Sequence, residues 1–334
     1  MVRVPLSPST PRCTSRLTTL TGAVGSVVDL GRGRKRKDNN PKTNYFSRYG
    51  PTKSFQGKTV VITGASSGIG KALALRYAQL GSKMVLAARR RDLLDDVVKA
   101  CISQGTDAIA VTVDVTKEDD CKKLIEEALA KFGSIDLLVI VSSDRNVLTP
   151  SQILNAGRGT LMPLRHVKPF ELDFMKSLTE INYYGCIYPT VQALPHIRSS
   201  KGNIAVISSL SAKVPSEGRA FYAATKAAIN SFYSCLRVEE PDITVTLINP
   251  GFVSTEINDH SFKPKGFKRH MEESSKMTAA RCAELCEGYI SRGVIDEVMT
   301  PLGKFGYFMA YFFPGLVDII SRQKSKQISA LIPE

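Results

Sequence analysis

The sequence predicts an α/β fold: a doubly wound parallel sheet of about seven strands, in one domain, with helices on both faces. Between residues 59 and 248, short runs of β-branched and other apolar residues alternate with segments whose apolar residues recur at helical spacing. The runs lack the polar alternation of a strand that faces water, which indicates strands buried on both faces. With 334 residues, 43% of them hydrophobic, the chain can bury one large core.

The predicted elements follow one another in a regular order. Strands are predicted at 59–62, 83–88, 108–114, 135–140, 202–207 and 244–248. Helices are predicted after the first strand and at 92–104, 117–132, 169–194 and 221–238. Gly133 is expected to close the helix at 117–132. Because strands and helices alternate, ligands are expected at the carboxyl ends of the strands.

The first strand runs into a glycine-rich turn, Thr63-Gly-Ala-Ser-Ser-Gly-Ile-Gly70, which leads into a helix. Gly64, Gly68 and Gly70 stand where a dinucleotide site needs residues without a side chain. They permit a tight turn, close approach of the backbone to a pyrophosphate, and close packing of the helix on the strand. The free amides at the helix start then face an anion. A glycine cluster alone also fits an ordinary strand-to-helix turn, so later motifs must decide.

The spacing Thr63-Gly64-x-x-x-Gly68-x-Gly70 resembles the short-chain dehydrogenase/reductase family in its classical form. Later motifs extend the resemblance over about residues 55–300. It implies a Rossmann-type sheet of strand order 3-2-1-4-5-6-7 and NAD(P)-dependent redox chemistry at a carbonyl or an alcohol. In this turn it implies cofactor contacts at Gly64, Ser66, Ser67, Gly68, Ile69 and Gly70.

The end of the second strand favours NADP(H) over NAD(H). The strand runs into three arginines, residues 89–91, with no carboxylate before Asp92. An acidic residue there accepts from the ribose 2′-hydroxyl of NAD, whereas a 2′-phosphate needs a cation. Arg89 is expected to bind that phosphate through a bidentate fork, while a solvated basic loop explains Arg91 better. The family resemblance assigns the adenine contact to Asp114 and Val115.

Two further segments match cofactor-binding motifs of the family. The first is Asn155-Ala156-Gly157, which normally follows the fourth strand, and the second runs from Pro250 to Thr255 after the sixth. The resemblance implies that the backbone of Val253 meets the nicotinamide carboxamide and that Thr255 faces the phosphates. The contacts implied in the second segment are Pro250, Gly251, Val253 and Thr255.

An atypical insertion precedes Asn155. Thirteen residues, 141–153, separate the fourth strand from Leu154, and removing them would restore an uninterrupted family pattern. One hypothesis is a translated intron or a splice variant, and the other is a tolerated surface loop. Loop closure at this length costs only about 1 to 2 kcal/mol, so the fold is expected to survive, but the placement of Asn155 and the activity of this chain depend on the answer.

The candidate catalytic residues begin with Tyr222 and Lys226, which share one helix face about one turn apart. Tyrosine in water loses its proton near pH 10, and a neighbouring cation favours the phenolate, which brings proton exchange towards neutral pH. A surface tyrosine beside a solvated lysine is the ordinary alternative. However, Ser209 ends the fifth strand thirteen residues before Tyr222, and Asn182 lies on the preceding helix. Together the four resemble the family's Asn-Ser-Tyr-Lys tetrad.

The resemblance implies a role for each member of this tetrad. Ser209 donates to the substrate carbonyl, and Tyr222 transfers the proton. Lys226 favours the phenolate and, with Tyr222, also contacts the cofactor ribose. Asn182 holds a water in the proton path, while Ser208 is expected to be structural.

The net charge of +14 is concentrated at the start of the chain. Residues 1–53 carry eleven Lys and Arg against two acidic residues, which leaves little excess for the remainder. No recognition helix or aromatic and basic module is evident after residue 53, which argues against nucleic acid as a partner. Residues 1–54 are expected to be a disordered extension and fit a transit peptide, a basic surface anchor or an incorrectly predicted start.

The tail, residues 301–334, contains thirteen uncharged, aromatic-rich residues at 305–317, followed by Arg322, Lys324 and Lys326. This run is too short to span a bilayer. Packing against the core or a second subunit is one interpretation, and peripheral contact with a membrane is the other. The family resemblance also implies a variable lid over the substrate, here at about 256–277, and its Phe262, Phe267 and Met271 indicate a lipophilic substrate.

The tail and the end of the second strand are similar to the hydroxysteroid and retinol dehydrogenase-like branch of the family. This branch implies a steroid-, retinoid- or lipid-like carbonyl or alcohol as substrate and association with the endoplasmic reticulum membrane, with the cytoplasm or mitochondrion as alternatives. A homodimer or homotetramer is also expected. A catalytically impaired NADP(H)-binding regulator and, less favoured by the glycine spacing, a sugar-nucleotide epimerase are the competing functions.

The cysteines predict neither disulfides nor a metal site. Seven are scattered through the chain without a Cys-x-x-Cys pair, which indicates reduced thiols. Cys282 and Cys286 share a helix face but have no histidine nearby, so they are expected to be half-buried thiols.

Overall fold

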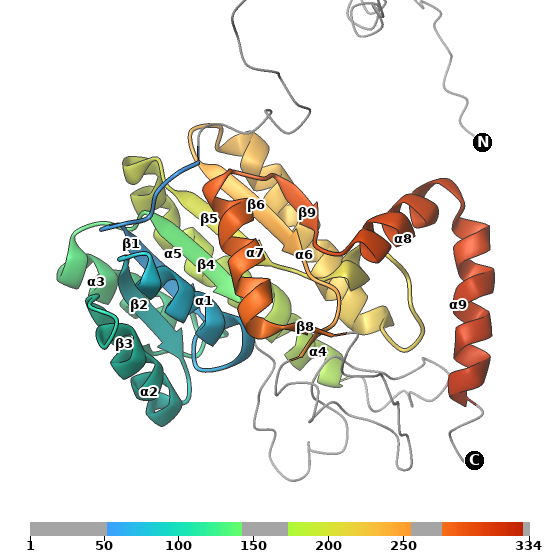
Figure 1. Cartoon of the computed structure of the whole chain (residues 1–334), viewed down its shortest axis with the longest axis horizontal. Helices are drawn as coiled ribbons and strands as arrows, with labels where there is room; N and C mark the ends of the chain where they lie inside the picture. Colours follow the sequence, from blue (N-terminus) through green and yellow to red (C-terminus); the bar gives the residue numbers. More distant parts are fainter. Residues whose placement is uncertain (1–51, 142–172, 255–275, 330–334) are drawn as a thin grey trace, which may run out of the picture. The chain divides into compact units, whose positions relative to one another are not determined.

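The computed structural model describes residues 52–141, 173–254 and 276–329. In this part of the chain, seven parallel strands form one sheet in the order β3-β2-β1-β4-β5-β6-β9 (Figure 1). The order confirms the predicted one, with β9 as the seventh strand of the sheet. The strands are β1 (Thr59–Thr63), β2 (Lys83–Ala88), β3 (Ala108–Thr112), β4 (Leu137–Val141), β5 (Asn203–Ile207), β6 (Thr244–Asn249) and β9 (Asp296–Val298).

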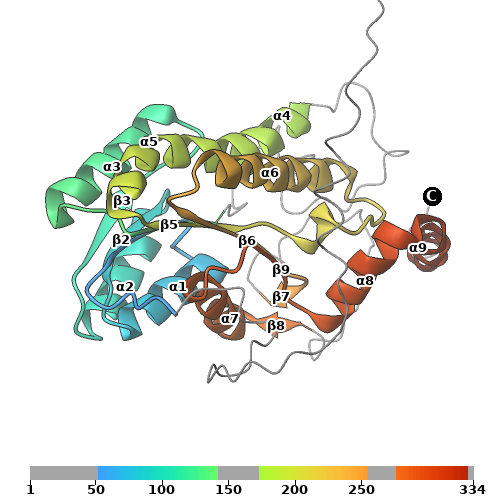
Figure 2. The ribbon, with the colours of Figure 1, turned by 90° about the horizontal axis from the view of Figure 1, so that it is seen from above.

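Helices cover both faces of this sheet (Figure 2). One layer consists of α1 (Gly68–Gln79), α2 (Arg91–Ile102) and α7 (Ala279–Ser291). The other consists of α3 (Glu118–Phe132), α5 (Gly185–Ser200) and α6 (Ala220–Glu239). Successive residues of β1 pack into opposite layers, Val60 and Ile62 into the first and Val61 into the second. This two-sided burial explains why the strands are continuous apolar runs.

The strand register aligns the carboxyl ends at one edge of the sheet. Thr63 of β1 pairs with Ala87 of β2, and Ile207 of β5 pairs with Val141 of β4 and Ile248 of β6. The segments that follow these strands therefore meet at the same edge. It is the edge at which parallel α/β sheets bind ligands.

The predicted helix at 169–194 is interrupted in the structure. It consists of α4 (Asp173–Thr179), a π-helical turn (Glu180–Tyr184) and α5. A π-helical turn adds one residue to a turn without a distinctive sequence pattern, so periodicity does not reveal it. Gly133 ends α3 with φ 77°, as predicted. A two-stranded sheet of β7 (Val253–Ser254) and β8 (Met277–Thr278) was not predicted, because strands this short leave no pattern.

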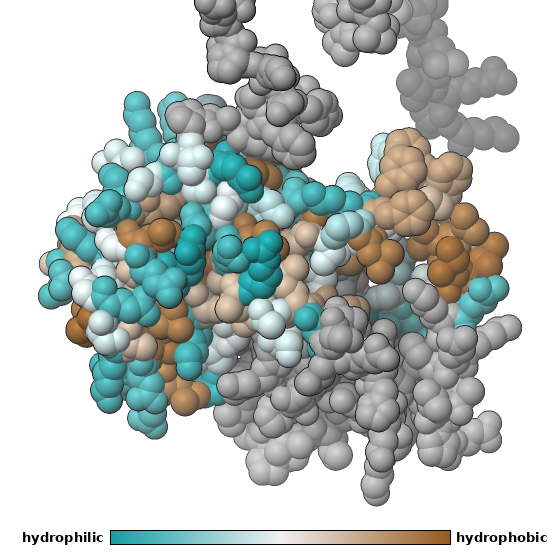
Figure 3. Space-filling view, viewed as in Figure 1, coloured by the Kyte–Doolittle hydropathy of each residue, from teal (hydrophilic) through white to brown (hydrophobic). Residues whose placement is uncertain are grey.

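The aromatic tail forms two helices, α8 (Pro301–Phe312) and α9 (Pro314–Ser329). Thr300 caps α8 by accepting a hydrogen bond from the Gly303 amide, and Pro301 occupies the first turn. Apolar side chains gather on the surface of both helices (Figure 3). No helix within the described ranges has the length and apolar character needed to cross a membrane.

The chain enters the folded unit at the amino ends of the strands. The Lys53 ammonium donates to Asn203 Oδ1 at 2.7 Å and to Thr244 Oγ1 at 3.1 Å, so this end of the predicted extension is bonded to β5 and β6. The rest of the extension, residues 142–153 of the insertion and nearly all of the predicted lid lie outside the described residues.

Candidate active site

The glycine turn between β1 and α1 has the backbone that its sequence predicts. Gly64 and Gly68 have φ values of 64° and 55°, a region that favours glycine. A Cβ atom on Gly70 would lie 2.2 Å from the Gly64 carbonyl oxygen, so only glycine fits there. The turn therefore brings backbone close to backbone at the start of α1, which leaves room for an anion to approach the helix amides.

The start of α1 suits a negatively charged ligand. Ser67 is the N-cap residue, and its side chain makes no capping hydrogen bond, while the first turn of the helix contains no acidic residue. The first amides and the positive end of the helix dipole therefore lack a carboxylate of their own helix. Ile69 is partly buried and packs against the core, so only its backbone is suited to a cofactor contact.

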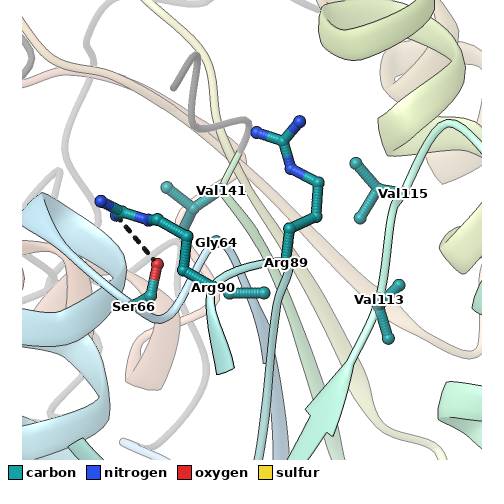
Figure 4. A pocket seen from close by; sticks show the side chains of 8 residues that line it. Gly64, Ser66, Arg89, Arg90, Val113, Val115 and Val141 are labelled. Atoms are coloured by element: carbon teal, nitrogen blue, oxygen red, sulfur yellow. Dashed lines mark hydrogen bonds between the residues drawn. The ribbon is translucent and has the colours of Figure 1, made fainter. Parts of the chain in front are cut away.

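A hollow of about 420 Å³, part of it open to solvent, lies beside the glycine turn at the carboxyl ends of β1 to β4 (Figure 4). Its walls combine small and apolar residues with two arginines: Gly64, Ser66, Ala88, Arg89, Arg90, Val113, Val115 and Val141.

The three arginines after β2 differ in their surroundings. Arg90 donates to Ser66 Oγ and Ser67 Oγ, both at 3.1 Å, and so ties the end of β2 to the glycine turn. Arg89 lines the hollow and extends away from Ser66 (Figure 4). Arg91 forms an ion pair with Asp95 at 2.9 Å on α2 and is not among the lining residues. Among the described residues, the lining of the hollow therefore includes two cations and no carboxylate.

Of the two predicted adenine contacts, Val115 and Asp114, one lines the hollow and the other does not. Val115 lines the hollow. The Asp114 carboxylate instead accepts hydrogen bonds from the Thr116 amide at 3.1 Å and the Thr116 hydroxyl at 2.8 Å, and Asp114 is not among the lining residues. One oxygen of Asp114 is thus engaged in a local turn.

Tyr222 and Lys226 lie on α6 as predicted. Lys226 is 2% exposed, and its Nζ lies 5.8 Å from the centroid of the Tyr222 ring and 3.5 Å from the Ile207 carbonyl oxygen. The lysine is therefore buried at the carboxyl end of β5 instead of solvated. The Arg219 guanidinium approaches the same ring at 5.5 Å, so two cations surround the half-buried phenol.

Asn182 is buried in the π-helical turn and connects to α6. Its Nδ2 donates to Thr225 Oγ1 at 3.2 Å, and Thr225 Oγ1 donates to the Tyr222 carbonyl oxygen at 2.8 Å. The neighbouring Cys186 thiol donates to the Asn182 carbonyl oxygen at 3.0 Å. Burial raises the pKa of Cys186 to about 11, against the opposing charge of Lys226, so this thiol stays protonated at neutral pH.

Ser209 begins the 3₁₀ turn Leu210–Ala212, and its Oγ accepts from the Ser211 amide at 3.2 Å. The turn packs against α6, which carries Tyr222, and is fixed to the segment after β6 because the Leu210 amide donates to the Pro250 carbonyl oxygen. Ser208 is buried, and among the described residues its hydroxyl has no hydrogen-bond partner.

The segment after β6 supplies the remaining predicted contacts. A Cβ added to Gly251 would lie 3.7 Å from Thr300 Cγ2 and Oγ1. This is an ordinary van der Waals distance, so packing does not require glycine there. Val253 is buried in β7. The predicted contacts at Asn155, Ala156, Gly157 and Thr255 lie outside the described residues.

A sequence model of the short chain dehydrogenase family matches residues 58–266. The chain belongs to this family. The short-chain dehydrogenase is 36% identical over 268 residues to 11-beta-hydroxysteroid dehydrogenase-like 2 of Arabidopsis thaliana, a match that covers 79% of this chain and 80% of the relative. It is 31% identical to the dehydrogenase/reductase SDR family protein 7-like of Dictyostelium discoideum, over 82% of this chain and 83% of that one. These matches confirm the predicted family and its hydroxysteroid dehydrogenase-like branch.

Solved structures of other short-chain dehydrogenases share the fold. An alcohol dehydrogenase from the archaeon Thermococcus sibiricus, complexed with 5-hydroxy-NADP, is 25% identical, with a TM-score of 0.59 and coverage of 72% of this chain and 94% of that one. A Burkholderia phymatum family member in complex with NAD is 23% identical, with a TM-score of 0.65 and coverage of 79% and 96%. Family membership makes this chain an oxidoreductase of carbonyl and alcohol groups with a nicotinamide nucleotide cofactor.

Two residues of this short-chain dehydrogenase site were missed by the sequence analysis. The sequence assigned Arg89 to the 2′-phosphate and Arg91 to a solvated loop but gave Arg90 no role, whereas in the structure Arg90 donates to two serine hydroxyls of the glycine turn. Thr225 lies next to Lys226 in the sequence, which is only a weak indication that it belongs to the site. Its hydrogen bond with Asn182, which only the structure shows, places it there.

Proposed function

We propose that this short-chain dehydrogenase interconverts a carbonyl and an alcohol with NADP(H), using Tyr222 as the general acid and base. The observation that carries the proposal is the burial of Lys226 beside the Tyr222 ring, with its ammonium held at the carboxyl end of β5. A buried ammonium favours a phenolate next to it, and it stands at the edge of the sheet where ligands bind.

In this proposal each of the four tetrad residues has a separate role in the proton transfer. In the reducing direction, Tyr222 gives its proton to the substrate oxygen and Ser209 donates to the same atom, which stabilises the charge that develops there. Lys226 stabilises the resulting phenolate. Asn182 is a positioning residue in this scheme, since Thr225 links it to the backbone of Tyr222.

The cofactor would be held by the glycine turn and the two arginines of the hollow. The close contact at Gly70 and the uncapped start of α1 fit a pyrophosphate, and Arg89 with Arg90 fits a 2′-phosphate. The nicotinamide ring, when bound, supplies or accepts the hydride. The described part of the lining contains no carboxylate, which favours NADP(H) over NAD(H).

The substrate is proposed to be a lipophilic carbonyl or alcohol, of steroid, retinoid or lipid type. Support comes from the relatives named as hydroxysteroid dehydrogenases and from the apolar surface of α8 and α9.

The test is the variant Tyr222→Phe, which removes only the hydroxyl. We expect turnover of a panel of lipophilic ketones, followed by the absorbance of NADPH, to fall by about 10³-fold, since general acid–base catalysis contributes about 10² to 10⁴. NADPH binding, measured by fluorescence titration, should stay within about twofold. Tyr289→Phe, on α7, is the matched control and should turn over normally.

Normal turnover by Tyr222→Phe would refute the proposed acid. Binding of NADPH by the wild-type chain without turnover of any ketone or alcohol would instead favour the non-catalytic regulator.

A further inference from the structure

Tyr233 of α6 is a buried phenol to which the proposed proton chemistry assigns no role. It is 0% exposed and is one of the largest side chains that are completely buried in the part of the chain that the structure describes. Its hydroxyl nevertheless reaches across to α5, where it donates to the Cys186 carbonyl oxygen at 2.8 Å. The two helices belong to the same layer of the fold (Figure 2), so this hydrogen bond joins neighbouring elements inside the core.

A second hydroxyl completes a buried polar bridge between α5 and α6. The Thr190 hydroxyl on α5 lies 2.6 Å from the phenol oxygen of Tyr233 and 2.8 Å from the Cys186 carbonyl oxygen, so both hydroxyl protons have an acceptor within the group. Burial raises the pKa of Tyr233 well above its ordinary value, so the phenol keeps its proton at neutral pH. A fully satisfied polar network in a buried layer holds its members rigidly.

The bridge has the same register as a contact in the candidate active site. Asn182 donates to Thr225 at the π-helical turn, and Thr190 meets Tyr233 further along the same two helices. Each pair joins residues 43 positions apart in the sequence. Thr225 and Tyr233 are eight residues apart on α6, which corresponds to about 12 Å. The second contact therefore fixes how far α5 has advanced along α6 when Asn182 meets Thr225.

The start of α5 depends on these side-chain hydrogen bonds, because its own backbone is weakened there. The Cys186 thiol donates to the Asn182 carbonyl oxygen at 3.0 Å, and the Cys186 carbonyl accepts from Tyr233. The π-helical turn that contains Asn182 ends at Tyr184, so α5 begins on a widened turn. Pro189 has no amide proton, so the helix lacks one of its backbone hydrogen bonds here.

We propose that Tyr233 is a positioning residue for the dehydrogenase reaction: its hydroxyl holds the start of α5 so that the π-helical turn presents Asn182 to Thr225. The inference rests on the proposed function, because this placement matters for turnover only if the tetrad carries the proton. Tyr233 is not among the residues that line the hollow, so the loss of its hydroxyl should act on catalysis and not on cofactor binding.

The test is Tyr233→Phe, which removes the hydroxyl and keeps the ring. We expect kcat with NADPH and a lipophilic ketone to fall about tenfold, the effect of losing one buried hydrogen bond, while the KM for NADPH stays within about twofold. The matched control is Tyr77→Phe on α1. Tyr77 is equally buried, but among the described residues its hydroxyl has no hydrogen-bond partner, so kcat should not change.

A double variant separates positioning from a general loss of packing. Effects at two sites about 12 Å apart ordinarily multiply, so Tyr233→Phe with Thr225→Val would lower kcat about 100-fold if each acted independently. If both act through Asn182, the double variant should fall only about tenfold, like each single variant. Multiplied effects, or a wild-type kcat for Tyr233→Phe, would overturn the inference.

Amide hydrogen exchange over residues 180–190 is a readout that needs no turnover. Tyr233→Phe should speed exchange there about tenfold, because the hydrogen bond that holds this stretch is lost, whereas Tyr77→Phe should leave it unchanged. Unchanged exchange in Tyr233→Phe would refute the positioning role whatever the activity. Faster exchange together with normal turnover by Tyr222→Phe would instead leave the hold on α5 in place and remove the proposed function.

Discussion

Arg90 is held by two hydroxyl groups of the glycine turn, and Arg89 lines the hollow with its side chain directed away from Ser66. The two arginines therefore have different parts to play in binding a 2′-phosphate. Arg90 is pre-oriented beside the turn, and Arg89 is the residue expected to form the bidentate fork.

Removal of either arginine should weaken NADPH binding selectively. We expect Arg89→Ala and Arg90→Ala each to raise the KM for NADPH by about 10- to 100-fold, because a hydrogen bond to a charged group contributes about 1.5 to 3 kcal/mol. The KM for NADH should change little. Arg91→Ala, which removes only the ion pair with Asp95, serves as the control, and an equal effect of that variant would contradict the assignment.

Thr225 offers a test of positioning at the residue scale. The variant Thr225→Val removes the hydroxyl that accepts from Asn182 Nδ2, so a buried amide loses its partner at a cost of about 1 to 3 kcal/mol. We expect kcat to fall about tenfold while the KM for NADPH stays constant. Thr225→Ser keeps the hydroxyl and should restore kcat; failure of that rescue would point to packing as the cause.

At the scale of the element, the effect of a glycine on the stability of a helix depends on what surrounds its Cα atom. Gly70 permits the helix to start against the backbone of Gly64, whereas Gly288 lies towards the carboxyl end of α7 with only the flexible end of the Arg292 side chain near it. The same substitution should therefore have opposite effects at the two positions.

Gly70→Ala should destabilise the protein by about 3 kcal/mol and abolish cofactor binding, because the added Cβ collides with the Gly64 carbonyl. Gly288→Ala should stabilise it by up to about 1 kcal/mol, the difference in helix propensity. Denaturant unfolding measures both. A Gly70→Ala protein as stable as the wild type would mean that the turn relaxes at little cost.

The elements also show what the sequence can reveal and why. Strands β1 to β6 were predicted to within two residues at either end, since a strand buried on both faces is a continuous apolar run. The tail was recognised by its composition but not as helices, because glycine and proline lower helix propensity. Its helical form depends on tertiary features, such as the cap at Thr300 and the fit of Gly303 against the core.

In the candidate site, too, features set by local geometry were predictable and features set by tertiary contacts were not. Tyr222, Lys226 and the glycine turn were predictable because their geometry is local, set by helical spacing and by the backbone. The pairing of Asn182 with Thr225 joins residues 43 positions apart, so sequence alone does not give it. Cys282 and Cys286, expected to be half-buried, are fully buried with their sulfur atoms 4.0 Å apart, because α1 covers α7.

At the scale of the whole molecule, buried thiols limit stability at high pH. Burial raises the pKa of Cys101 to about 11 and, with neighbouring acidic residues, that of Cys121 to about 12. The unfolded thiols ionise near pH 9, so the stability present below pH 9 is lost as the pH rises towards 11 or 12.

Each such thiol should lower the free energy of unfolding by about 1.4 kcal/mol per pH unit in this window. Guanidinium unfolding at a series of pH values measures the slope. Cys121→Ala should reduce it, whereas Cys235→Ala, which removes an exposed thiol, should leave it unchanged. A slope that Cys121→Ala does not alter would assign alkaline unfolding to other groups.

Lys53 determines where the chain joins the sheet. Its ammonium is bonded to the first residues of β5 and β6, Asn203 and Thr244, and the candidate active site lies beyond the last residues of the same strands. An affinity tag, a fluorophore or a solid support attached directly at residue 52 is thus linked to the side remote from cofactor and substrate. Immobilisation through that end should leave ligand access open, which suits the protein to surface-based binding measurements.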